Sequence, residues 1–89
     1  MSSMAYLGEF IGTLVFLTII LKSGGDKYVI VLGLMAAILL MGDLSGGHFN
    51  PAISFMKCMN GSMDCKVAGG YIAAQLLGAF LAIKVASLK

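Results

Sequence analysis

Three long apolar stretches, at residues 4–21, 28–43 and 67–88, most constrain what this chain can fold into. As helices rising 1.5 Å per residue, the first and third reach about 25 to 30 Å, close to the thickness of the hydrocarbon core of a bilayer. The second reaches only about 22 Å over residues 28–42, so it needs Asp43 or surrounding protein to complete its span. Only 11% of the residues are charged, whereas soluble domains carry about a quarter. We therefore expect an all-α integral membrane protein with three transmembrane helices.

The charges exclude several classes of function. The net charge is +2 and the lysines stand singly, so the chain lacks the basic patch that nucleic-acid binding requires. The opening MSSMAYLGEF has no basic run before its apolar residues, so we expect the first stretch to remain as a span rather than to be cleaved as a signal. No grouping of catalytic, zinc-binding or phosphate-binding residues is visible. We expect neither an enzyme nor a cofactor nor a metal site.

The segment at residues 44–57 interrupts the apolar pattern. Gly46 and Gly47 allow backbone turns that other residues resist, and Asn50 followed by Pro51 is typical of a helix start, with Asn as the N-cap and Pro at the first helical position. Ala52 and the apolar residues after it supply about two helical turns. Irregular backbone is tolerated at membrane depth only where protein buries it or where it lines a watery cavity. The pattern predicts a re-entrant loop followed by a half-helix.

The amino end of such a half-helix points toward the membrane midplane. It carries about half a positive charge from unpaired N–H groups, which repels cations. The side-chain amide of Asn50 adds a hydrogen-bond donor there, while its oxygen caps the helix. A small neutral solute that accepts hydrogen bonds fits this arrangement.

Three motifs in this order resemble the first half of the aquaporin and aquaglyceroporin family of membrane channels, also called major intrinsic proteins. EFIGTLVF resembles the first-helix pattern of the family, SGGHFNPA its Asn-Pro-Ala loop, and YIAAQLLGA its third-helix pattern. The resemblance covers nearly the whole chain as a single repeat, residues 1–89. Members of the family carry two such halves in inverted orientation, whose Asn-Pro-Ala tips meet and line a pore. The resemblance thus implies passive transport of water or small neutral solutes such as glycerol.

The resemblance also implies roles for individual residues. Glu9 would accept hydrogen bonds from the re-entrant loop, with Thr13 on the same helix face and Gln75 giving similar support from the third span. His48 would line the pore near the tip or pack within the loop; a metal ligand or a pH sensor are the other readings of a histidine here. The remaining pore-lining candidates are Gly46, Gly47, Asn50, Pro51, Ala52, Ile30 and Ile53.

Two of these positions depart from the family pattern. Ile30 stands where the resemblance places an aromatic residue of the constriction. Ile53 stands where the second half of the family carries an arginine after Asn-Pro-Ala. Facing each other across an antiparallel pair, these two aliphatic side chains would make the constriction apolar and wider, so water alone need not be the preferred solute.

A second copy inserted upside down would complete the inverted repeat with identical subunits. With the N-terminus inside, as the resemblance implies, Lys57 and Lys66 lie inside, whereas Lys22, Lys27 and Lys89 lie outside with Lys84 near the outer interface. The lysines are thus distributed almost evenly between the two sides, with a slight bias against the positive-inside rule. A protein that inserts in both orientations needs such a weak bias. By analogy with the tetramers of the family, four antiparallel pairs would form the assembly, placed in the plasma or inner membrane. The alternative is a separate chain that supplies the second half.

Two other functions remain open at this stage. The stretch MKCMNGSMDC gathers thioether and thiol groups that suit Cu(I), which would make the chain a membrane copper carrier. Methionine as a general apolar filler and cysteines without a role in a reducing compartment are the simpler reading. In copies that expose this stretch to the outer face, a disulfide between Cys58 and Cys65 could form. A non-conducting assembly subunit of another channel would need no open pore at all.

Overall fold

The structure, a computed structural model, describes residues 3–88, which form four helices and no strand. Helix α1 spans Ser3–Lys22, α2 spans Lys27–Ser45, α3 spans Pro51–Met59 and α4 spans Cys65–Ala86. Helices α1, α2 and α4 are each long and apolar enough to cross a membrane. The prediction of an all-α membrane protein with three spans and one half-helix is confirmed.

Side-chain caps set where the helices begin. Asp26 accepts hydrogen bonds from the backbone N–H groups of Tyr28 and Val29 at 2.9 and 3.3 Å, and Asp64 accepts one from Lys66 at 2.8 Å. Helices α2 and α4 therefore begin directly after aspartate caps, slightly before the apolar stretches from which the spans were predicted. Helix α2 also continues to Ser45, so its 19 residues remove the expected shortfall in length.

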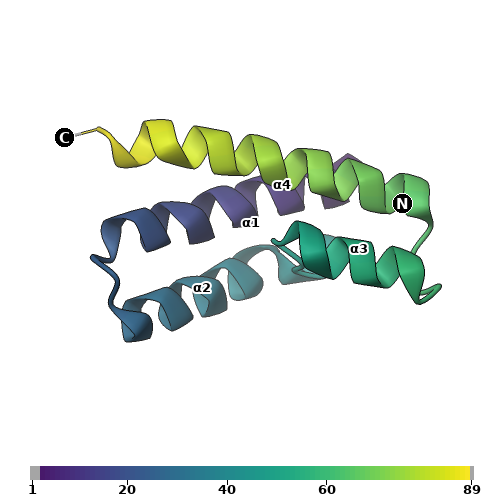
Figure 1. Cartoon of the computed structure of the whole chain (residues 1–89), viewed down its shortest axis with the longest axis horizontal. Coiled ribbons are helices and arrows are strands. Elements are labelled where there is room, and N and C mark those ends of the chain that lie inside the picture. The colour runs from purple at the N-terminus through teal and green to yellow at the C-terminus, as the bar shows by residue number, and fades with distance from the viewer. Residues whose placement is uncertain (1–2, 89) are drawn as a thin grey trace.

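Helix α1 lies between α2 and α4, and α3 packs against α4 (Figure 1). Within residues 3–88, α3 packs against neither α1 nor α2. Figure 1 shows α3 beginning near the middle of the long axis of the bundle and running to the end where α1 starts. The amino end of α3 thus lies near the middle of the bundle, as expected of a helix that enters only half of a membrane.

Small residues let the helices approach closely. On α4, a side chain at Gly78 would place its Cβ only 2.7 Å from the carbonyl oxygen of Phe10 in α1. On α2, the buried residues are Gly33, Ala37 and Ser45. Close approach of backbones is how helices gain packing energy in lipid, where no hydrophobic force drives them together.

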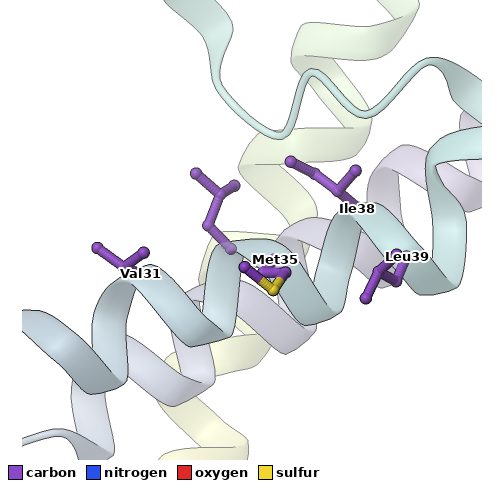
Figure 2. A pocket seen from close by; sticks show the side chains of 5 residues that line it. Val31, Met35, Ile38 and Leu39 are labelled. Atoms are coloured by element: carbon purple, nitrogen blue, oxygen red, sulfur yellow. The ribbon is translucent and has the colours of Figure 1, made fainter.

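The outer face of α2 is apolar and uncovered. It holds a shallow hollow of about 270 Å³ lined by Val31, Leu34, Met35, Ile38 and Leu39. Figure 2 shows the side chains of this hollow, all of which project from α2. Such a surface is suited to contact with lipid chains.

Candidate functional site

The buried side chain of Glu9 holds the re-entrant loop, residues 46–50. The backbone N–H groups of His48 and Phe49 donate to its Oε2 and Oε1 at 3.1 and 2.8 Å. The hydroxyl of Ser45 donates to Oε2 at 2.7 Å, and Nε2 of Gln75 donates to Oε1 at 2.8 Å. Four donors from α2, the loop and α4 thus converge on two oxygens, an arrangement that an ionised carboxylate accepts in full. Glu9 replaces water for loop amides that would otherwise be unpaired at membrane depth.

A second set of hydrogen bonds joins the loop and α3 to α4. Nε2 of Gln75 also donates to Oγ of the buried Ser54 at 2.8 Å. The same Oγ lies 2.9 Å from Nδ1 of His48. Since the amide nitrogen can only donate, Ser54 accepts from Gln75 and its own proton is free to bond Nδ1 of a neutral imidazole. Ser54 therefore links the first turns of α3 to both the loop and α4.

The imidazole of His48 is packed inside the protein. Its ring centroid lies 4.9 Å from that of Tyr71 in α4, whose hydroxyl donates to the carbonyl oxygen of Ser45 at 2.6 Å. Burial lowers the pKa of His48 below its ordinary value of 6.5; Glu9 opposes this shift, and Lys57 adds to it. The electrostatics thus favour the neutral imidazole that the Ser54 contact accommodates.

The backbone of the loop makes turns that few residues adopt. Gly46 and Gly47 have φ values of 90° and 70°, and the N–H of Gly46 caps α2 by donating to the carbonyl oxygen of Gly42 at 2.7 Å. Phe49 also has a positive φ, of 51°, which is uncommon for a bulky residue. Its buried ring occupies the space that a side chain at Gly12 of α1 would need. The packing of this ring and the bonds to Glu9 hold the loop in that conformation.

Asn50 stands exposed at the amino end of α3. Its Oδ1 accepts a hydrogen bond from the backbone N–H of Ala52 at 2.9 Å, and Pro51 occupies the first helical position. Because the amide group is planar, fixing the oxygen on the helix turns the nitrogen away from it. The result is an exposed donor of fixed direction at the positive end of a helix dipole.

The other sequence-predicted residues lie around this centre. Thr13 is buried on α1, with its Cβ 3.2 Å from where a Cβ of Gly78 would stand. Ile30 is half-buried in the first turn of α2, whereas Ile53 is exposed in the first turn of α3. Because α2 and α3 begin at different points along the long axis of the bundle (Figure 1), one chain does not bring these two first turns side by side.

Sequence reasoning assigned no role to Ser45, Ser54, Phe49 or Tyr71. The serines are small polar residues in apolar surroundings, a weak signal that could have marked them as hydrogen-bond partners for Glu9 and Gln75. Neither the positive φ of Phe49 nor the reach of Tyr71 across to α2 has a local signal in the sequence.

The two cysteines are joined. A disulfide links Cys58 near the end of α3 to Cys65 at the start of α4. This is the bond considered above for copies that expose this stretch to the outer face, and the simpler reading, in which the cysteines stay reduced, does not hold for this structure. Because Cu(I) binds thiolate rather than disulfide sulfur, this state also withdraws the strongest ligands of the proposed copper site. Residues 3–88 contain no cluster of three His, Cys, Asp or Glu side chains able to hold a metal.

A model of the family described as Major intrinsic protein matches residues 1–88. The chain belongs to this family. It is 43% identical to Glycerol uptake facilitator protein-like 6 of Lactiplantibacillus plantarum over 86% of its length, and 37% identical to human Aquaporin-9 over 84%. It is 35% identical to Aquaporin NIP3-1 of Arabidopsis thaliana over 92%. The matches span only 39%, 30% and 29% of these three proteins. The comparison with solved structures found no match.

Proposed function

We propose that this chain forms one half of a passive channel in the cell membrane for water or small neutral solutes such as glycerol. The observation that carries the proposal is Asn50, an exposed amide fixed on the amino end of a half-helix at mid-depth. It presents a hydrogen-bond donor to an acceptor such as a hydroxyl oxygen, while the helix dipole opposes cations. The names of the relatives, which include a glycerol uptake facilitator and two aquaporins, support the same class of solute.

Asn50→Asp tests this role directly. A carboxylate can still cap α3, but it replaces the donor with a negative charge at the tip. In vesicles carrying the purified protein, glycerol and water flux should fall and the exclusion of monovalent cations should weaken. Asn60→Asp, which makes the same change in the exposed turn after α3, should leave both unchanged. Equal flux and ion exclusion in wild type and Asn50→Asp would contradict the pore role. A wild type without flux would favour a non-conducting subunit.

A second copy inserted in the inverted orientation completes the pore in this proposal. Residues 3–88 provide one half-helix, and a lone copy leaves the Asn50 tip facing lipid on one side. Lys57 near the end of α3 and Lys66 in the first turn of α4 belong to the end of the bundle where α1 starts (Figure 1). The other described lysines belong to the opposite end: Lys22 ends α1, Lys27 begins α2 and Lys84 stands in the last turn of α4. This small difference supports insertion in both orientations. Four such pairs would then form the assembly, which native mass spectrometry can count.

Orientation can be measured with Ser3→Cys in a chain that also carries Cys58→Ser and Cys65→Ser. An impermeant thiol reagent should label about half of the chains in intact cells if both orientations occur in equal numbers, and all of them after permeabilisation. Labelling entirely from one side would contradict the inverted pair and require a different second half.

A further inference from the structure

The two ends of the half-helix α3 are held by different kinds of bond. Its amino end is joined to the buried polar cluster: the N–H groups of the preceding loop donate to Glu9, and Ser54 accepts a hydrogen bond from Gln75. Its carboxyl end lies outside this polar cluster. Phe55, Met56 and Met59 are exposed, and Ser54 is the only described residue of α3 that is buried.

The turn after α3 is held by bonds within itself. The N–H groups of Ser62 and Met63 both donate to the carbonyl oxygen of Lys57, at 3.0 and 3.1 Å. The N–H and the hydroxyl of Ser62 also donate to Oδ1 of Asn60. The turn is exposed at Asn60, Gly61 and Asp64. Besides the packing of α3 against α4, a disulfide between Cys58 and Cys65 cross-links this end to the start of α4 and closes a loop with a sequence separation of seven.

This disulfide is open to reagents. Cys65 is exposed and Cys58 is half-buried, so a thiol or a disulfide in the surrounding water can reach the pair. The end of α3 and the start of α4, which carry the cysteines, lie at the end of the bundle where α1 starts (Figure 1). In a membrane-spanning bundle, that end faces one aqueous compartment only. Whether the bond persists depends on the redox state of that compartment, since disulfides persist on oxidising faces and thiols on reducing ones.

We propose that Cys58 and Cys65 form a redox-controlled tether of the half-helix, closed where this end of the chain faces an oxidising compartment and open where it faces a reducing one. Closure removes two electrons and two protons from the two thiols. A low-molecular-weight disulfide such as oxidised glutathione takes them up: one cysteine attacks it and releases one glutathione thiol, and the other displaces the second. Reduction by thiols runs the same exchange backwards.

The tether makes the two copies of an inverted pair unequal, a step that rests on the proposed function. Their cysteine pairs lie on opposite faces of the membrane. In a membrane with one oxidising and one reducing face, one copy carries a closed tether and the other an open one. The pore then has one half-helix whose carboxyl end is cross-linked to α4 and one whose carboxyl end is not.

Redox state and orientation can be read on the same full-length chains. Cells carrying the chain with a C-terminal epitope are treated with an impermeant protease, which removes the epitope where the carboxyl end of α4 faces outward. Free thiols are then blocked with N-ethylmaleimide, disulfides are reduced, and the released thiols are labelled with a large maleimide polymer. Chains that keep the epitope, with the cysteines outward, should carry two labels; chains that lose it should carry none. Cys58→Ser in combination with Cys65→Ser is the control for labelling.

The outcomes separate this proposal from the proposed pair. If all chains have one orientation, the pair fails, and the tether stands if their cysteines are oxidised when outward or reduced when inward. If both orientations occur but oxidation does not follow orientation, the tether proposal is overturned and the pair stands. Cysteines reduced in both orientations, or joined to other chains, also overturn it.

A second measurement tests the mechanical role without reference to orientation. Purified protein in vesicles is held in oxidised or reduced glutathione, and amide hydrogen exchange is followed by mass spectrometry. Reduction should speed exchange several-fold at residues 56–64, while residues 46–54 stay protected by Glu9 and Gln75. Oxidised and reduced protein with the same exchange at residues 56–64 would show that the disulfide does not restrain α3. The double serine variant should match the reduced wild type in both buffers.

Discussion

The α1–α4 side of the bundle and the outer face of α2 are stabilised by different kinds of residue. Between α1 and α4 lies a polar cluster of Glu9, Ser54 and Gln75, with backbones in close approach at Gly78. The outer face of α2 is a row of exposed apolar side chains around a shallow hollow. Hydrocarbon cannot hydrogen-bond, so the first side must meet directional requirements and the second only has to be apolar. Specificity in this fold therefore resides in the α1–α4 side.

Glu9→Gln should disrupt the polar cluster between α1 and α4 and have the largest effect on stability and flux. The new amide keeps one acceptor oxygen but turns an N–H group toward donors that the carboxylate accepted, which leaves buried groups unpaired. We expect a loss of about 2–4 kcal/mol in the free energy of unfolding in detergent, together with loss of solute flux. Asp43→Asn, an exposed carboxylate on α2, is the matched control and should change neither. Equal stability of the two variants would show that the cluster does not hold the loop.

Gly78→Ala should have the next largest effect on the free energy of unfolding. Its Cβ meets the backbone of α1, at 2.7 Å from the carbonyl oxygen of Phe10 and 3.2 Å from the nitrogen of Leu14, so the helices must separate. A loss of about 1–3 kcal/mol in the free energy of unfolding is expected.

Two other glycines sharpen this comparison. Gly69→Ala, on the same helix with nothing near its Cβ, should gain up to about 1 kcal/mol from helix propensity. Gly33→Ala on α2 meets the side chain of Ile19 rather than backbone, and should cost less than Gly78→Ala because that side chain can move. If Gly33→Ala costs more, the α1–α2 contact is the tighter of the two.

The pH dependence of stability should be smaller and should come from His48. Burial places the pKa of His48 in the folded protein below its ordinary value of 6.5, so the unfolded chain binds the proton more readily. The contribution of His48 to the stability of the folded protein is therefore fully present at pH values above 6.5 and is lost as the pH falls below that value. Thermal unfolding in detergent across this range should show a decline on the acid side that His48→Gln removes. A decline that persists in His48→Gln would assign the effect to another group.

Leu39→Ala on the outer face of α2 should have the smallest effect. Its side chain is 77% exposed in the single chain, and the folded and unfolded states in a membrane leave it in similar apolar surroundings. We expect a change within about 0.5 kcal/mol, measured by unfolding of the monomer in detergent. A larger loss would show that this face is covered by protein rather than by lipid.

Much of the fold could be predicted because it depends on local pattern. The apolar stretches mark three spans, and the Asn50-Pro51 pair marks the start of the half-helix. The helix ends were less predictable, since α2 and α4 begin at caps supplied by Asp26 and Asp64 rather than at the first apolar residue. The resemblance to the family pointed to Glu9 and Gln75 and to the loop, and all three lie in one polar cluster. It did not point to Ser45, Ser54, Phe49 or Tyr71.

The sequence by itself determined the features that depend on residues close together in the chain. These are the helical stretches, the glycines at turns, the cap of α3 and the apolar surface. Only the tertiary structure decided which groups meet. Ser45 and Gln75 reach Glu9 across sequence separations of 36 and 66, and the ring of Phe49 takes the space left at Gly12. The pairing of Cys58 with Cys65 depends on how α3 returns to α4. Hydrogen bonds and close contacts depend on distances in space, and these are set when the helices pack.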